Sequence, residues 1–80
     1  MHDEILKILQ KKILQIKMED DKIHQIIDEF KNFDSNSFSS GIVVGRLFNS
    51  FYYQHRRILK RNPTESDFQD FLKFLKKELK

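Results

Sequence analysis

Hydrophobic residues recur every three or four positions along most of this chain, which is the spacing of one face of an α-helix. The pattern predicts four helices, near residues 3–17, 21–33, 40–61 and 65–79. One Pro, two Gly and 34% charged residues among 80 also favour helix over sheet. We therefore expect an all-α protein, a small compact bundle whose four helices form a single domain over residues 1–80.

The predicted central helix, residues 40–61, carries an apolar face that we expect to contact the other three helices. At 100° per residue, six apolar side chains and one histidine fall in a stripe about 120° wide. They are Val44, Leu47, Phe48, Phe51, His55, Ile58 and Leu59. Because His55 lies in the middle of this stripe, we expect a buried neutral imidazole hydrogen-bonded to another helix rather than a catalytic base.

The opposite face of the same helix is cationic. No acidic residue occurs between Asp34 and Glu65, and all four arginines of the chain fall within residues 46–61. The polar side chains of this face and of the helix end are Arg46, Asn49, Ser50, Tyr53, Arg56, Arg57, Lys60 and Arg61. Arginine binds phosphate and carboxylate oxygens with two parallel hydrogen bonds, so this face is the candidate binding surface of the protein.

Helices 3–17 and 21–33 have two alternative arrangements. The cluster of acids at residues 19–21 resembles the start of a new helix. However, the apolar spacing continues across it and neither Gly nor Pro interrupts residues 1–40, so one long helix is the alternative. Within helix 3–17, Lys12 falls inside the apolar stripe, where its methylene stem can be buried while its ammonium group stays in water.

Local signals set the boundaries of the central helix. Residues 34–37 are Asp, Ser, Asn and Ser, which predict a loop, and Ser39 is the expected N-cap, with Phe38 and Val43 in contact around it. Gly41 and Gly45 are one helical turn apart, and we expect them to mark a tight crossing with another backbone.

The last helix has the clearest start. Pro63 ends the central helix near Asn62, and Thr64 and Asp67 have the spacing of a capping box. Helix 65–79 then carries acids in its first turn and lysines in its last turn, as the helix dipole favours.

Charge is distributed unevenly along the chain. The net charge is +3, but residues 1–40 have six Lys and eight acidic residues, whereas residues 41–80 have nine Lys and Arg and four acidic residues. This distribution favours an anionic partner. The longest apolar run is residues 42–44, which is too short to cross a membrane. The chain has no Cys, and its acidic first residues are unlike a secretory signal, so we expect a cytoplasmic protein.

The sequence contains only weak signals for metal binding or catalysis. His24 and Asp28 are four residues apart and could share a metal ion, but two ligands without further His or Cys do not make a metal site, so we expect no metal or cofactor. No serine has a paired base, and neither Gly belongs to a phosphate-binding loop. We therefore expect no enzyme activity.

Two functions remain. The first is a non-enzymatic module that binds nucleic-acid phosphates through its Arg-rich face with low sequence specificity. The alternative is a protein interaction module, with a homodimer as one version, in which this face binds an acidic partner or the acidic half of a second copy. A third arrangement would leave the face bound to acids of the same chain, among them Glu19, Asp20 and Asp28.

Overall fold

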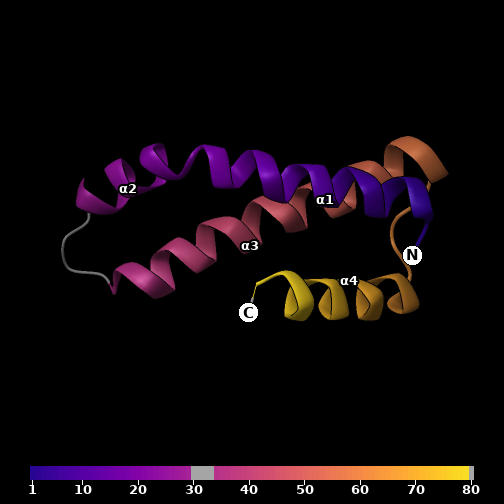
Figure 1. The fold of residues 1–80 in the computed structure, drawn as a ribbon. Coiled ribbons are helices and arrows are strands. Elements are labelled where there is room, and N and C mark those ends of the chain that lie inside the picture. Colours follow the sequence, from indigo (N-terminus) through magenta and orange to yellow (C-terminus); the bar gives the residue numbers. More distant parts are fainter. Residues whose placement is uncertain (30–33, 80) are drawn as a thin grey trace.

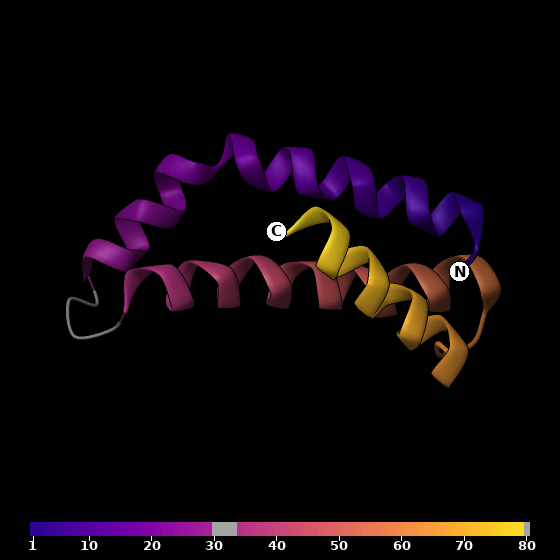
Figure 2. The same cartoon turned by 60° about the horizontal axis from the view of Figure 1, so that its bottom comes forward.

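The computed structural model describes residues 1–29 and 34–79, apart from the side chain of Ser35. Its elements are α1 (Asp3–Met18), α2 (Asp20–Glu29), α3 (Ser35–Gln54), the π-helical turn η1 (His55–Leu59) and α4 (Glu65–Glu78). The all-α fold is therefore confirmed. Helices α1 and α2 run along α3, while α4 lies beside only the carboxyl-terminal half of α3 (Figures 1 and 2). The molecule is elongated, measuring 40 × 20 × 20 Å.

Helices α1 and α2 are separate elements joined at Glu19, so the alternative of one long helix is wrong. The Glu19 amide donates to the Ile16 carbonyl at 3.0 Å, one residue closer than in an α-helix, and the chain bends there (Figure 2). The Ile23 amide donates to the Glu19 carbonyl at 3.2 Å, which restarts the α-helical pattern. Residues 30–33, the end of the predicted second helix, lie outside the described residues.

Helix α3 begins earlier than its local sequence indicates. The prediction of a loop at residues 34–37 and of an N-cap at Ser39 was wrong, because Asp34 is the N-cap and the helix starts at Ser35. The Phe38 amide already donates to the Asp34 carbonyl at 2.9 Å. Phe38 packs against the core, and its burial outweighs the modest helix propensity of the serines.

At its other end, the predicted central helix stops before Arg61 and changes from α-helical to π-helical geometry in its last turn. The helix remains α-helical to Gln54 and continues as η1 over residues 55–59. Lys60 then adopts a left-handed conformation, with φ 58° and ψ 31°, which ends the helix before Pro63. The predicted central rod is therefore continuous, but it spans residues 35–59.

The start of α4 agrees with the prediction. The Asp67 amide donates to Thr64 Oγ1 at 3.1 Å, and the Thr64 amide donates to Asp67 Oδ2 at 2.9 Å, so the capping box is complete.

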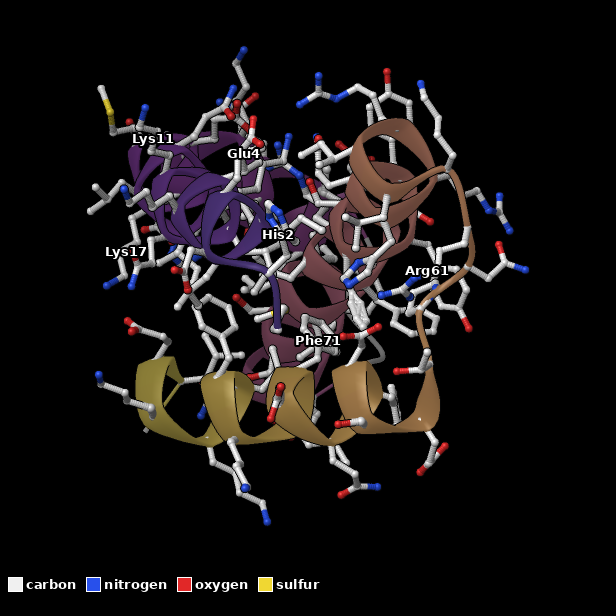
Figure 3. All side chains as sticks on the ribbon, turned by 90° about the vertical axis from the view of Figure 1, so that its right-hand side faces the viewer. His2, Glu4, Lys11, Lys17, Arg61 and Phe71 are labelled. Carbon is white, nitrogen blue, oxygen red and sulfur yellow. The ribbon has the colours of Figure 1, made fainter. Side chains whose placement is uncertain are left out.

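The core lies where α1, α2 and α4 meet α3. Its most buried side chains are Ile5, Leu9, Ile13, Ile16, Ile23, Ile27, Leu47, Phe51, Phe71 and Phe74. Phe71 points from α4 toward α3 (Figure 3), and its ring lies 4.4 Å from that of Phe51. Part of the predicted core stripe is exposed, however: Val44 is 36% and Phe48 40% exposed. Ile58 and Leu59 are half-buried.

The prediction of a tight crossing at Gly41 and Gly45 was wrong. A Cβ atom placed on either glycine would have no atom within 4 Å. Both residues lie on an open flank of α3, so their small size serves no contact within the described residues. Over residues 1–29 and 34–79, no helix combines the length and the apolar character needed to span a membrane.

Candidate nucleic-acid interface

A groove runs between α1 and α3 on the basic side of the molecule. It has a volume of about 600 Å³ and is open to solvent. It is lined by Lys12, Arg46, Asn49, Ser50, Tyr52, Tyr53, Gln54 and Arg56. Three of these side chains are cationic and none is a carboxylate, so the groove itself favours an anionic occupant.

The fold brings together five of the eight predicted binding residues. Arg46, Asn49, Ser50, Tyr53 and Arg56 line the groove, whereas Arg57, Lys60 and Arg61 do not.

Sequence reasoning missed three groove residues, Lys12, Tyr52 and Gln54. One signal pointed to Lys12, because a lysine inside the apolar stripe of a helix faces the neighbouring helix. Lys12 is half-buried, and because α1 packs along α3 it contributes to the lining of the groove.

Arg46 is bound to a carboxylate of the same chain. Its Nη1 donates at 2.5 Å to Oε2 of Glu19, the residue between α1 and α2. This hydrogen bond lowers the pKa of Glu19. Both side chains remain about one-third exposed. One of the internal pairings considered from the sequence therefore exists, although the other guanidinium nitrogens of Arg46 have no hydrogen bond within the described residues.

Arg56 and Arg57 are exposed and bind neutral groups. Arg56 Nε donates to Asn62 Oδ1 at 2.8 Å, and its guanidinium carbon lies 5.6 Å from the centre of the Tyr52 ring. Arg57 Nε donates to Gln54 Oε1 at 2.9 Å. In the described part of the chain no carboxylate pairs with Arg56, Arg57 or Lys60. Their positive charges are thus available to an anion.

Arg61 has a structural role. It lies beside the segment leading into α4 (Figure 3), and its Nη1 donates to Asp67 Oδ2 at 3.0 Å. Asp67 is 9% exposed, and burial by itself would raise its pKa. The Thr64 amide, Arg61, the Thr64 hydroxyl and nearby His55 outweigh burial and lower the pKa of Asp67 to about 2. Arg61 therefore helps to hold the capping box of α4 together.

His55 is fully buried, as expected, but its hydrogen bond is not to another helix. Its Nδ1 lies 2.7 Å from the Phe51 carbonyl oxygen of the same helix, so Nδ1 carries a proton and donates. Its Nε2 has no hydrogen bond among the described residues and lies 3.7 Å from Asp67 Oδ2. The imidazole thus lies between η1 and α4 and does not line the groove.

The described residues contain no group of three or more His, Cys, Asp or Glu side chains that could hold a metal ion. His24 instead lies 3.1 Å from Asp20, and both side chains are 62% exposed. The groove offers guanidinium, ammonium, amide and hydroxyl donors beside two tyrosine rings. Comparisons with protein-family models, curated proteins and solved structures find no match, so the function has to be argued from this geometry.

Proposed function

We propose that this protein is a non-enzymatic module that binds nucleic acid through its phosphates, with little base specificity, in the groove between α1 and α3. The observation that carries the proposal is the lining of that groove, which holds the cationic side chains of Lys12, Arg46 and Arg56. Among the described residues, only Arg46 of these three is paired with a carboxylate, that of Glu19. A phosphate backbone presents one negative charge per nucleotide, and neutralising several of them is the main source of non-specific affinity.

The tyrosines favour a single strand over a duplex. Tyr53 is 61% exposed at the groove, and Tyr52 lies beside it under the Arg56 guanidinium. An exposed aromatic ring can stack on an unpaired base, which contributes about 1–3 kcal/mol per base and tolerates any sequence. Bases in a duplex are already stacked on one another and cannot use these rings. We therefore expect tighter binding to single strands.

Salt dependence provides the test of this proposal. Binding of a fluorescent single strand and of a duplex of equal length is measured by anisotropy over a range of salt concentrations. Affinity for the single strand should fall steeply with salt, with a slope of about −0.7 per phosphate contact. A short polyglutamate peptide serves as the comparison ligand. If the peptide binds as tightly as the strand, or the strand does not bind at low salt, the proposal is wrong.

A pair of charge-matched variants locates the site. Lys12→Gln removes one positive charge from the groove. Lys11→Gln removes one from an exposed position outside it. The groove variant should reduce the salt slope by about 0.7, whereas the control should change affinity only slightly through net charge. Equal losses in both variants would show that net charge, and not the groove, attracts the strand.

A further inference from the structure

One flank of α3 presents small and apolar residues to solvent. Ser37, Gly41, Gly45 and Phe48 follow one another at three- and four-residue spacing, and Val44 lies beside Gly45, so they form one strip, here called the α3 strip. Val44 is 36% and Phe48 40% exposed, and the space above both glycines is empty to 4 Å. The Phe48 ring is large and the surface at Gly41 is open, so the two are complementary in shape.

Among the described residues, most of the strip is uncovered because α4 lies beside only the carboxyl-terminal half of α3 (Figures 1 and 2). Phe48, at the end of the strip, has its ring centre 6.4 Å from that of Phe68 and 6.1 Å from that of Phe71, both on α4, and stays 40% exposed. Where α4 ends, a second hollow of about 600 Å³ opens beside the strip. Val43, Val44, Leu75 and Leu79 contribute its apolar lining, and Leu79 is 38% exposed. Exposed apolar surface next to a hollow is typical of a surface that packs against another protein.

Opposite charges stand at the two ends of this flank. Asp34 is the exposed N-cap of α3, and its carboxylate accepts a hydrogen bond from Ser37 Oγ at 2.6 Å, which lowers its pKa. Arg56 lies at the other end, about 33 Å along the helix. Neither has an oppositely charged partner within residues 1–29 and 34–79. Gly45 lies midway between them in sequence.

We propose that a second copy of this chain packs on the α3 strip, with the two α3 helices antiparallel and crossing near Gly45. A twofold axis there pairs residues whose numbers add up to about 90. Asp34 then meets the partner subunit's Arg56, and the Phe48 ring fits over the partner subunit's Gly41. Both contacts occur twice, as a symmetric interface requires. Antiparallel helix dipoles attract each other, and so do Asp34 and the partner subunit's Arg56, which favours this orientation over a parallel one.

The same geometry bears on nucleic-acid binding, and this consequence rests on the function proposed above. The twofold axis runs perpendicular to both helices. Each helix therefore presents the surface that lies a quarter turn from its strip on the same side of the dimer. Asn49 and Tyr53 lie on that surface and line the groove. Both grooves would therefore open on the same face of the dimer, where one strand could contact both. In the dimer Arg56 is paired with the partner subunit's Asp34, so in the described part of the chain Lys12 is the unpaired cation of each groove.

Association is measured by sedimentation equilibrium without nucleic acid, so that its outcome is independent of the binding proposal. The wild-type chain should form dimers with a Kd between about 1 μM and about 1 mM, the range of modest interfaces. Gly41→Leu should raise this Kd at least tenfold, because leucine occupies the place of the partner subunit's Phe48. The control, Gln15→Leu, adds the same side chain at an exposed position of α1 and should leave the Kd unchanged. A wild-type monomer throughout, or an unchanged Kd for Gly41→Leu, would overturn the proposal.

A charge exchange tests the orientation. Asp34→Arg and Arg56→Asp should each weaken dimerisation, and the double variant should restore it, because the two ends then attract again with reversed signs. Circular dichroism confirms that each variant is folded.

A single cysteine gives a second measurement, since the chain contains none. Gly45→Cys should form a disulfide-linked dimer on mild oxidation, whereas Ser37→Cys should not, because only residues near the axis meet their own copies. Equal cross-linking at both positions would indicate a parallel pair and contradict the proposal, as would a double charge variant that stays monomeric.

Discussion

The two halves of α3 differ in what covers them, although both belong to one helix. The carboxyl-terminal half and η1 bury Leu47, Phe51 and His55 completely under α1 and α4. The amino-terminal half has α1 and α2 on one side only, and Val44 and both glycines remain exposed on the other. At 1.5 Å per residue, α4 is about 21 Å long and α3 about 30 Å, so α4 ends before it reaches the first turns of α3. Burial thus depends on the length of the neighbour as much as on the helix pattern.

The largest expected effect comes from two phenylalanines one turn apart on α3, Phe51 on its covered face and Phe48 on its exposed flank. Phe51→Ala should lower the free energy of unfolding by about 3–5 kcal/mol, because it removes a fully buried ring that contacts Phe71. Phe48→Ala should cost only about 1–2 kcal/mol, because Phe48 is 40% exposed. Urea denaturation followed by circular dichroism measures both, and equal losses would mean that the flank is as well packed as the covered face.

A smaller effect is expected from acid at the start of α4. The folded-state pKa of Asp67 is lowered from 3.8 to about 2, so its contribution to stability is present above pH 3.8 and is lost as the pH falls toward 2. The loss should amount to about 2 kcal/mol. Asp67→Asn should flatten the pH dependence of the free energy of unfolding in this window, whereas Asp28→Asn at an exposed site should leave it unchanged. A steep slope that persists in Asp67→Asn would place the acid-sensitive group elsewhere.

The smallest expected effect is a gain in stability, at Gly45 on the exposed flank of α3. Gly45→Ala should raise the free energy of unfolding by about 0.5–1 kcal/mol, because alanine favours helix and its Cβ would meet no atom within 4 Å. The measurement is made at a concentration at which the wild-type chain sediments as a monomer. Destabilisation there would mean that the flank is covered within a single chain.

Part of the candidate site could be predicted from the sequence. The 100° rotation per residue places Arg46, Asn49, Ser50, Tyr53 and Arg56 on one side of a helix, and all five line the groove. The same reasoning could not tell which arginines have carboxylate partners, since Glu19 is 27 residues from Arg46 in sequence and meets it only because α1 and α2 pack on α3.

The sequence by itself determined the all-α fold and the capping box of Thr64 and Asp67, because periodicity and capping depend on residues within one or two turns. Only the tertiary structure decided that α3 begins at Ser35, that Val44 and Phe48 are exposed, and that Arg46 and Arg61 are paired while Arg56 and Arg57 bind neutral groups. The physical reason is that burial and ion pairing depend on distances between elements, which are set by where each neighbouring helix ends and bends.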